Sequence, residues 1–415
     1  MESRPTPCTP ALKFRELPES ELDRALDLAY LAFHEKPEAE LRAHHKELLR
    51  GCTRVGAYDG DALVGTVSAL PFTLSVPGGE LPCPGVTFAC VAPTHRRRGA
   101  LSGMLAELFA RCAAQDWPIA ALWASEAVIY GRFGFGEGTR GVTVEIDSAR
   151  PLALRIAPDD RPLRLLSPAD APAQLAAFYD RTRAGRPGRI ARSRAWWAEE
   201  WMAEKDEEDA SFSPPRVVAL GGPGEPLAGY AIYRTKREDD APGLVRLDDL
   251  EAETPAAAAA LWQYAASVDL TAKVRAWGRP VDDPLLLFAA DRDQVRVTAG
   301  FPALWLRLLD VRTALLRRSY AAPVDLVLDV HDAHLPVNSG PHRLSCSPRG
   351  VAYEPTHDPA DLSLAVRDLA ACYLGGTSPT ALVRAGLATE HTPGAAETLT
   401  AALRTDHAPH TVDGF

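Results

Sequence analysis

The stretch Ala89-Cys-Val-Ala-Pro-Thr-His-Arg-Arg-Arg-Gly-Ala-Leu101 decides the fold of the N-terminal region. An apolar strand pattern leads into it, a short polar turn follows, and a helical pattern starts just after Gly99. Helix N-termini carry unpaired N–H groups and a positive dipole end, so they bind phosphate. Gly99 lets the backbone approach a pyrophosphate, and Arg96 and Arg97 add cationic donors. We predict a phosphate-bearing ligand here; the alternative is an exposed basic turn without a ligand.

A second informative segment begins about 25 residues later and runs Trp123-Ala-Ser-Glu-Ala-Val-Ile-Tyr-Gly-Arg-Phe-Gly-Phe135. It is typical of a buried strand that leads into a short helix, which Gly134 then ends. Tyr130 lies on that helix. The pKa of a phenol, ~10, is close to that of an alkyl thiol, so the Tyr130 hydroxyl could protonate a departing thiolate. We predict an acid role for Tyr130; the alternative is a tyrosine that only packs in the core.

Around these segments the first ~150 residues alternate between strand and helix patterns, as in α/β folds. The Asp59-Gly60 pair predicts a hairpin turn between two of the strands. The expected helices are Glu19–Phe33 and Leu101–Gln115, and the expected strands are Arg54–Tyr58, Ala62–Val76, Leu81–Val91, Ile119–Ala124 and Gly141–Ile146.

A proline-containing linker over Asp147–Pro162 leads to a second α/β region with the same order of hairpin, strand, helix and strand. Its expected elements are strands at Arg216–Leu220, Leu227–Lys236, Leu244–Ala252 and Leu285–Ala290, with a helix at Pro255–Leu270. The last ~110 residues are typical of a small α+β domain. Its expected elements are strands at Val324–Val330 and Arg343–Ser347 and helices at Asp361–Tyr373, Pro379–Ala385 and Pro393–Leu403.

Composition limits the classes of partner and location. The formal charge of −10 argues against nucleic acid and suits attraction of cationic small molecules, although it also serves ordinary solubility. No apolar run approaches the ~20 residues of a membrane span, and Met1–Pro10 lacks the apolar core of a signal peptide. The seven cysteines are scattered without Cys-x-x-Cys pairs, and the histidines form no ligand set. We therefore expect a cytoplasmic protein without membrane contact, disulfides or metal.

Together, Arg96-x-x-Gly99-x-Leu101 and Tyr130-x-x-x-Gly134-Phe135 resemble the cofactor loop and the later tyrosine motif of the GNAT superfamily of acetyltransferases. Leu101 replaces the small residue usual in that loop. The amino-acid sequence of three segments is similar to that of the Eis (enhanced intracellular survival) family. These segments are Val91–Gly99, Ala124–Glu126 and Ile129–Gly134. The resemblance implies tandem GNAT-like domains at 1–148 and 149–304 followed by a sterol-carrier-like domain at 305–415. Since Glu251–Pro255 offers acid and proline instead of Arg and Gly, only the first domain is expected to bind acetyl-CoA.

The resemblance also implies roles for individual residues. Tyr130 would be the general acid, the carboxylate of the last residue, Phe415, the general base, and Glu35 a contact for a cationic amine. The N–H of Val91 would polarise the thioester carbonyl. The expected acetyl-CoA contacts are Ala89, Cys90, Val91, Arg96, Arg97, Arg98, Gly99, Ala100, Leu101, Ser102, Ser125 and Glu126.

The activity implied is direct acetyl transfer to primary amines of polycationic small molecules, of which aminoglycosides are the best-known class. Relatives can carry an acid just before the terminal Phe, where this chain has Gly414 after Asp413, so its aminoglycoside range is open. One alternative is acetylation of protein lysines or polyamines. An alternative of another class is lipid or sterol carriage by the third domain, with a vestigial GNAT site. The family also implies a homohexamer.

Overall fold

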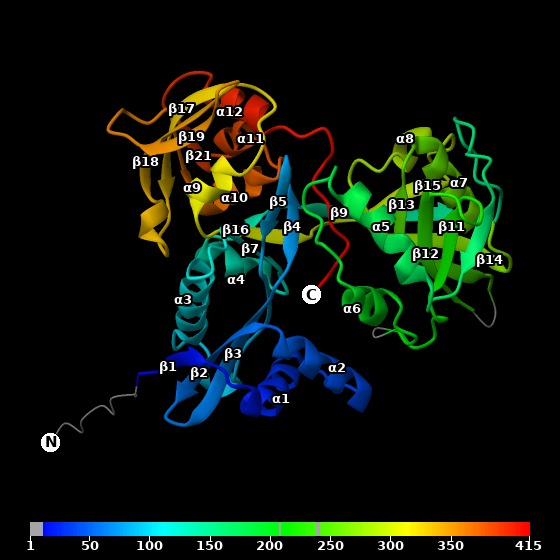
Figure 1. The fold of residues 1–415 in the computed structure, drawn as a ribbon, viewed down its shortest axis with the longest axis horizontal. Coiled ribbons are helices and arrows are strands. Elements are labelled where there is room, and N and C mark those ends of the chain that lie inside the picture. Colours follow the sequence, from blue (N-terminus) through cyan, green and yellow to red (C-terminus); the bar gives the residue numbers. More distant parts are fainter. Residues whose placement is uncertain (1–10, 207–208, 238–240) are drawn as a thin grey trace.

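The computed structural model describes residues 11–206, 209–237 and 241–415. The expectations for Met1–Pro10 and for Cys8 therefore lie outside the described residues. Figure 1 shows three parts, each built on its own sheet: the first in blue and cyan, the second in green, and the third in yellow to red. The described helices include none that is long and apolar enough to cross a membrane.

The first sheet has the strand order β1-β2-β3-β6-β7-β16-β8. Its hairpin turn at Asp59-Gly60 is where the sequence predicts it, with Gly60 at a φ of 60°. The strands are β1 (Lys13–Glu16), β2 (Thr53–Asp59), β3 (Ala62–Leu70), β6 (Gly85–Val91), β7 (Ile119–Trp123), β8 (Gly136–Glu137) and β16 (Leu304–Leu308). The helices beside it are α1 (Leu22–Phe33), α2 (Ala39–Arg50), α3 (Ala100–Ala113) and α4 (Ala127–Tyr130), and a separate hairpin is formed by β4 (Thr73–Val76) and β5 (Gly79–Pro82).

The second sheet has the order β10-β11-β12-β13-β14-β9-β15. Its strands are β9 (Arg140–Asp147), β10 (Leu163–Leu166), β11 (Arg216–Leu220), β12 (Gly229–Lys236), β13 (Gly243–Ala252), β14 (Thr271–Pro280) and β15 (Val295–Pro302). Its helices are α5 (Ala171–Arg183), α6 (Arg194–Trp196) with a π-helical turn at Trp197–Trp201, α7 (Pro255–Ala265) and α8 (Leu285–Phe288).

One predicted strand of this region is wrong. Leu285–Ala290 begins as the short helix α8, because the Asp283 side chain accepts a hydrogen bond from the Leu285 N–H at 2.9 Å and caps the turn. The strand that follows α7 is instead β14, which lies between β13 and β9. A short apolar run does not reveal by its pattern alone whether it is a strand or a buried helical turn.

The third sheet has the order β19-β18-β17-β20-β21. Its elements are β17 (Val324–His331), β18 (Gly340–Ser347), β19 (Gly350–Pro355), β20 (Leu362–Ala365), β21 (Ala388–Glu390), α9 (Val311–Leu316), α10 (Val366–Tyr373), α11 (Pro379–Arg384) and α12 (Ala395–Leu403). The helix predicted for Asp361–Tyr373 is wrong in its first part. There β20 pairs in parallel with β17, and the helix starts only at Val366.

The first and second sheets exchange strands along the chain. After β8 the chain enters the second sheet as β9, between β14 and β15, and it returns to the first sheet as β16, between β7 and β8. The third part joins the same core, since Leu74, Leu306 and Leu369 belong to one buried cluster. The predicted divisions at residues 148 and 304 stay predictions. Within the first sheet, β7 pairs with β16, the strand that returns from the second sheet (Figure 1).

Candidate active site

The strands β6 and β7 diverge, and this divergence opens the site. They run parallel but pair only at Gly85 and Ala121, near the start of β6. On its other side β6 has a bulge against β3, where the register slips and Phe88 takes a φ of 48°. A bulge bends its strand, so the later part of β6 leaves β7. Backbone groups between two separated strands need new partners, which an extended ligand with amide groups can supply.

The loop after β6 leads directly into helix α3. Asp59, at the hairpin between β2 and β3, holds this loop through a hydrogen bond with the His95 ring and an ion pair with Arg98, both at 3.2 Å. Arg97 has a φ of 62° and Gly99, the N-cap of α3, a φ of 81°. Among the described residues, no side chain caps this helix start. Its first N–H groups are therefore available to an anion, as the sequence motif predicts.

A cavity of about 750 Å³ connects the separated strands with the start of α3. Most of the residues predicted to contact acetyl-CoA line this cavity together with Tyr130. They are Ala89, Cys90, Val91, Arg96, Arg97, Gly99, Ala100, Leu101, Ser102, Ser125 and Glu126. Two segments far apart in the sequence, the loop before α3 and the turn after β7, thus form opposite parts of one site.

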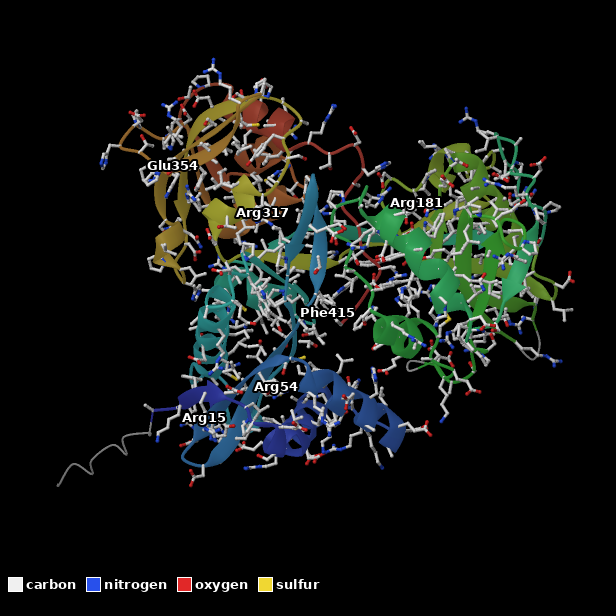
Figure 2. All side chains as sticks on the ribbon, viewed as in Figure 1. Arg15, Arg54, Arg181, Arg317, Glu354 and Phe415 are labelled. Atoms are coloured by element: carbon white, nitrogen blue, oxygen red, sulfur yellow. The ribbon has the colours of Figure 1, made fainter. Side chains whose placement is uncertain are left out.

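Three of the predicted site residues do not line this cavity. Arg98 faces Asp59 instead. Glu35 is exposed and follows His34, a residue that does line the cavity. Phe415 lies outside, near the centre of the molecule (Figure 2). The roles of all three stay predictions.

Tyr130 is buried at the end of α4 and lines the cavity. Burial raises the pKa of its phenol above the usual value, and the neighbouring Ser125 side chain opposes this rise. The phenol is therefore protonated at neutral pH and able to donate a proton. This state is the one that an acid for a departing thiolate needs.

The turn that follows Tyr130 rests on an ion pair that sequence analysis missed. A Cβ at Gly134, whose φ is 83°, would lie 2.7 Å from Nη1 of Arg307 on β16. The buried guanidinium of Arg307 donates to both carboxylate oxygens of Asp332, at 2.6 and 2.8 Å. Only the return of β16 to the first sheet brings these residues together, so no local motif marks them.

The C-terminus reaches the point at which β6 and β7 part. The ring of Phe415 packs against that of Phe72, with centroids 4.9 Å apart. A Cβ at Gly85 would lie 2.6 Å from the Phe415 ring, so glycine is needed there for this contact. The Trp123 indole, at the end of β7, donates to the backbone oxygen of Asp413 at 2.8 Å. The last residue is therefore fixed beside the strands that form the cavity.

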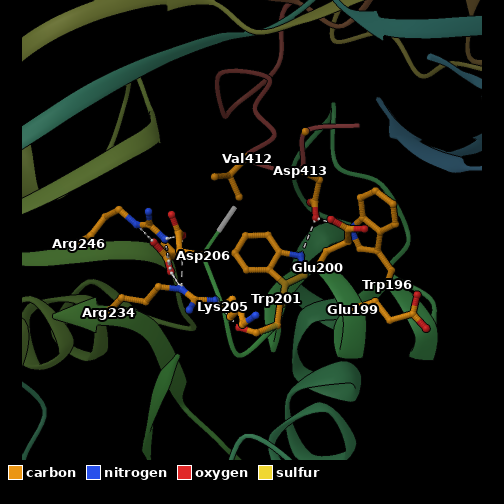
Figure 3. Close-up of a pocket in the computed structure, with 13 residues that line it drawn as sticks. Trp196, Glu199, Glu200, Trp201, Lys205, Asp206, Arg234, Arg246, Val412 and Asp413 are labelled. Carbon is orange, nitrogen blue, oxygen red and sulfur yellow. Dashed lines mark hydrogen bonds and ion pairs between the residues drawn. The ribbon is translucent and has the colours of Figure 1, made fainter. Parts of the chain in front are cut away.

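A second cavity, of about 230 Å³, lies alongside the C-terminal tail (Figure 3). Its walls include the rings of Trp196 and Trp201 and the carboxylates of Glu199 and Glu200. These two carboxylates bind the two ring nitrogens of His44 on α2, at 2.7 and 2.9 Å, and they raise the pKa of His44. The rest of the lining is Ala203, Lys205, Asp206, Arg234, Arg246, Asp248, Val412, Asp413 and Gly414.

The second sheet contains a similar strand-to-helix junction that is closed by its own residues. Helix α7 starts after β13, and the Thr254 side chain accepts from the Ala257 N–H at 3.1 Å. Glu251 and Glu253 lie beside this start. A capped helix start flanked by carboxylates is unfavourable for a phosphate, in contrast to the uncapped start of α3.

A bulged strand that parts from its parallel neighbour, an uncapped helix start and a buried tyrosine in one cavity define the class of GNAT acetyltransferases. Comparison with known families agrees. Residues 13–138 and 188–313 each match an acetyltransferase (GNAT) domain, and residues 311–412 match a sterol carrier protein domain.

Relatives extend over the same organisation. An N-acetyltransferase from Streptomyces avermitilis is 40% identical over 94% of this chain and 96% of its own. The N-acetyltransferase Eis of Mycobacterium tuberculosis is 36% identical over 72% of this chain and 75% of its own. The crystal structure of Eis1 from Mycobacterium abscessus is 33% identical and superposes with a TM-score of 0.84, covering 98% of this chain and 100% of that one. The chain belongs to the Eis family of GNAT N-acetyltransferases, enzymes that use acetyl-CoA as donor.

Proposed function

We propose that this enzyme transfers the acetyl group of acetyl-CoA directly to primary amines of polycationic small molecules, with aminoglycosides as the first class to test. The observation that carries the proposal is the single cavity that unites the uncapped start of α3, the parting strands β6 and β7, and Tyr130. Pyrophosphate would bind at Arg97–Ser102, and the pantetheine arm would pair along Ala89–Val91 and pass Ser125 and Glu126. Acetyl-CoA would bind in this cavity and not at the capped start of α7.

In the proposed reaction the amine nitrogen attacks the thioester carbon, and the Val91 N–H stabilises the charge that develops on the carbonyl oxygen. The C–S bond then breaks, and Tyr130 gives its phenolic proton to the thiolate of CoA. The Phe415 carboxylate accepts the proton that the amine loses, directly or through a water. Tyr130 thus acts as the acid toward the leaving thiolate, and the Phe415 carboxylate acts as the base toward the attacking amine.

Negative charge near the tail supports a cationic substrate. The second cavity has more carboxylates than cations, since Glu199, Glu200, Asp206, Asp248 and Asp413 line it with Lys205, Arg234 and Arg246. Glu35 directly follows His34, which lines the first cavity. The net charge of −10 also attracts a cationic substrate to the protein. Lysine side chains of proteins and polyamines share this cationic chemistry, so they remain the alternative acceptors.

A screen for CoA release separates these acceptors. The purified enzyme is incubated with acetyl-CoA and kanamycin, spermidine or a lysine peptide, and the products are identified by mass spectrometry. We expect release with kanamycin and a product heavier by whole acetyl groups. Release with spermidine or the peptide alone would replace the aminoglycoside proposal. Absence of release with every amine, together with a lipid in the purified protein, would favour a carrier function.

The contribution of the basic loop is testable by acetyl-CoA titration. Replacing Arg96 and Arg97 together by glutamine removes the two guanidinium groups of the loop that line the cavity. We expect the Kd for acetyl-CoA to rise about tenfold or more, since hydrogen bonds to charged groups contribute ~1.5–3 kcal/mol each.

Arg98→Gln tests the predicted contact of the arginine that faces Asp59, and a smaller rise in the Kd for acetyl-CoA is expected.

Arg111→Gln is the matched control for this titration. Arg111 lies in the last turn of the same helix, α3, where it pairs with Glu107 at 2.8 Å, far from the loop at the helix start. Its replacement should leave the Kd for acetyl-CoA within about twofold. A wild-type Kd in the Arg96/Arg97 double variant would contradict the placement of the pyrophosphate.

Two further features rest on the family resemblance and on the cysteines. We infer a homohexamer in solution, as in the family, and a location in the reducing cytoplasm. The location is supported by the cysteines that the structure describes, since Cys52, Cys83, Cys90, Cys112, Cys346 and Cys372 are all free.

A further inference from the structure

We infer that Asp413 is a positioning residue, whose buried carboxylate anchors the tail and thereby holds the carboxylate of Phe415 at the reaction site. The inference deepens the proposed function and rests on it for the role of Phe415. It concerns a residue that the terminal Phe motif does not include.

The Asp413 carboxylate is buried in the second part of the molecule and accepts hydrogen bonds at both oxygens. Oδ1 accepts from Arg192 Nε at 2.8 Å and from the indoles of Trp196 and Trp201 at 3.1 and 3.0 Å. Oδ2 accepts from Arg192 Nη2 and from the Tyr179 hydroxyl, both at 3.2 Å. Figure 3 shows Trp196 and Trp201 directed at Asp413. A carboxylate with this many donors has one favoured position.

The partner of Asp413 is itself fixed. Arg192 is fully buried and also donates to Asp249 at 2.8 Å. Its guanidinium lies 3.8 Å from the centre of the Trp201 ring and 4.0 Å from that of Tyr179. Loss of the Asp413 charge would leave this buried guanidinium with one carboxylate partner, Asp249, in place of two, which is unfavourable. The anchor is therefore rigid and depends on the negative charge of Asp413.

The same residue also ties the tail to the first part of the molecule. Its backbone oxygen accepts from Trp123, at the end of the diverging strand β7. Gly414 is exposed, and a Cβ there would meet no described atom within 4 Å. The next contacts are those of the Phe415 ring with Phe72 and Gly85. Since a residue spans at most ~3.6 Å, an anchor two residues before the end restricts the terminal carboxylate to a small volume.

A tail anchor of this kind differs from a residue that only stabilises the packing of the second part. An anchor acts through Phe415, so its loss has no further effect once Phe415 is absent. A packing residue lowers activity through the folded fraction, whether or not Phe415 is present. Release of the last residue by a carboxypeptidase measures the position of the tail without relying on catalysis.

The test uses the full chain with Asp413→Asn, deletion of Phe415, and both changes together. We expect Asp413→Asn to speed the release of Phe415 by carboxypeptidase about tenfold or more, because cleavage follows the population of the freed tail. Its kcat should fall about 10- to 100-fold, as for a misplaced catalytic group, while the Kd for acetyl-CoA stays within about twofold. The double variant should be no slower than the Phe415 deletion.

Two more variants complete the test: one serves as a control and the other replaces Asp413→Asn if that variant does not fold. Asp282→Asn is the matched control: it removes a tail contact at the Ala408 N–H, seven residues before the end, and should leave both readouts unchanged. If Asp413→Asn fails to fold by thermal melting, Trp123→Phe removes the indole donor to the Asp413 backbone, keeps an aromatic ring beside Trp277, and should speed release in the same direction.

The outcomes separate the two proposals. Wild-type release and kcat in folded Asp413→Asn, while the Phe415 deletion is inactive, would overturn the anchor alone. If the losses in kcat from Asp413→Asn and from the Phe415 deletion add in the double variant, the anchor would also be overturned, in favour of a packing role for Asp413. Wild-type turnover after deletion of Phe415 would overturn the terminal carboxylate as base, and with it the catalytic part of this inference.

Discussion

We expect turnover to fall about 10²- to 10⁴-fold when one glycine is added after Phe415, because the carboxylate that we propose as the acceptor of the amine proton would move away from the reacting nitrogen. The ring of Phe415 still packs on Phe72 and Gly85, and Asp413 still holds the tail. The cavity proposed for acetyl-CoA does not include the tail, so the Kd for acetyl-CoA is expected to stay at its wild-type value. Steady-state CoA release with the best amine and titration with acetyl-CoA measure the two quantities.

The matched control for the added glycine is Phe415→Leu. This change keeps a terminal carboxylate at the same position in the chain and loses only the aromatic contact with Phe72. We expect a loss of turnover below about tenfold, since the base is retained and only packing is reduced. Amidation of the C-terminus should act like the added glycine, because it removes the charge without adding a residue. If the amidated enzyme turns over normally, the base is another group.

The local parts of the site could be predicted from the sequence, and the structure explains why. A strand, a basic loop and a helix start that follow each other in the chain stay together in space, so Arg96–Ser102 could be placed at one helix start. Tyr130 could be recognised because the short helix and its closing glycine are also local. The tandem organisation with a carrier-like domain is confirmed by the matched domain families.

The long-range parts could not be predicted from patterning. Periodicity reports which face of an element is buried but not which sheet receives it, so it does not reveal that β9 and β16 cross between the first two sheets. The contact of Arg307 with the turn at Gly134 depends on that crossing, because β16 carries Arg307 back to the first sheet. From the sequence alone, Asp413 resembles an ordinary surface carboxylate near a chain end. Its partner Arg192 lies more than 200 positions earlier in the chain, so no local pattern links the two.

The functional consequence is that both groups proposed for catalysis are supported from outside the first GNAT domain, which we propose binds acetyl-CoA. Arg307 and Asp332 lie behind the turn that follows Tyr130, and the second part of the molecule holds the tail that ends in Phe415. A buried ion pair fixes geometry even where it adds little net stability. The second and third parts therefore serve the reaction as supports, although the cavity itself is built mainly from the first.

Tyr130→Phe is expected to lower kcat about 10²-fold, because the thiolate of CoA then leaves without a proton donor. Phenylalanine keeps the ring that packs edge-on against Phe135 with centroids 6.1 Å apart, so the free energy of unfolding should change little. Since burial raises the pKa of Tyr130, its protonated form persists to above pH ~10. The loss should therefore be uniform from pH 6 to 9. Only the wild type should lose activity further where Tyr130 ionises, at still higher pH.

The matched control for this prediction is Tyr58→Phe. Tyr58 is a buried tyrosine on β2, in the same part of the molecule as Tyr130, and its hydroxyl donates to Glu21 at 2.9 Å, away from the cavity. Burial and this carboxylate raise its pKa to about 12, so it resembles Tyr130 in environment but not in position. We expect Tyr58→Phe to keep kcat within about twofold, while the free energy of unfolding falls by ~1.5–3 kcal/mol because a hydrogen bond to a carboxylate is lost. Equal kcat values for the two variants would reduce Tyr130 to a packing residue and leave water as the proton donor to the thiolate.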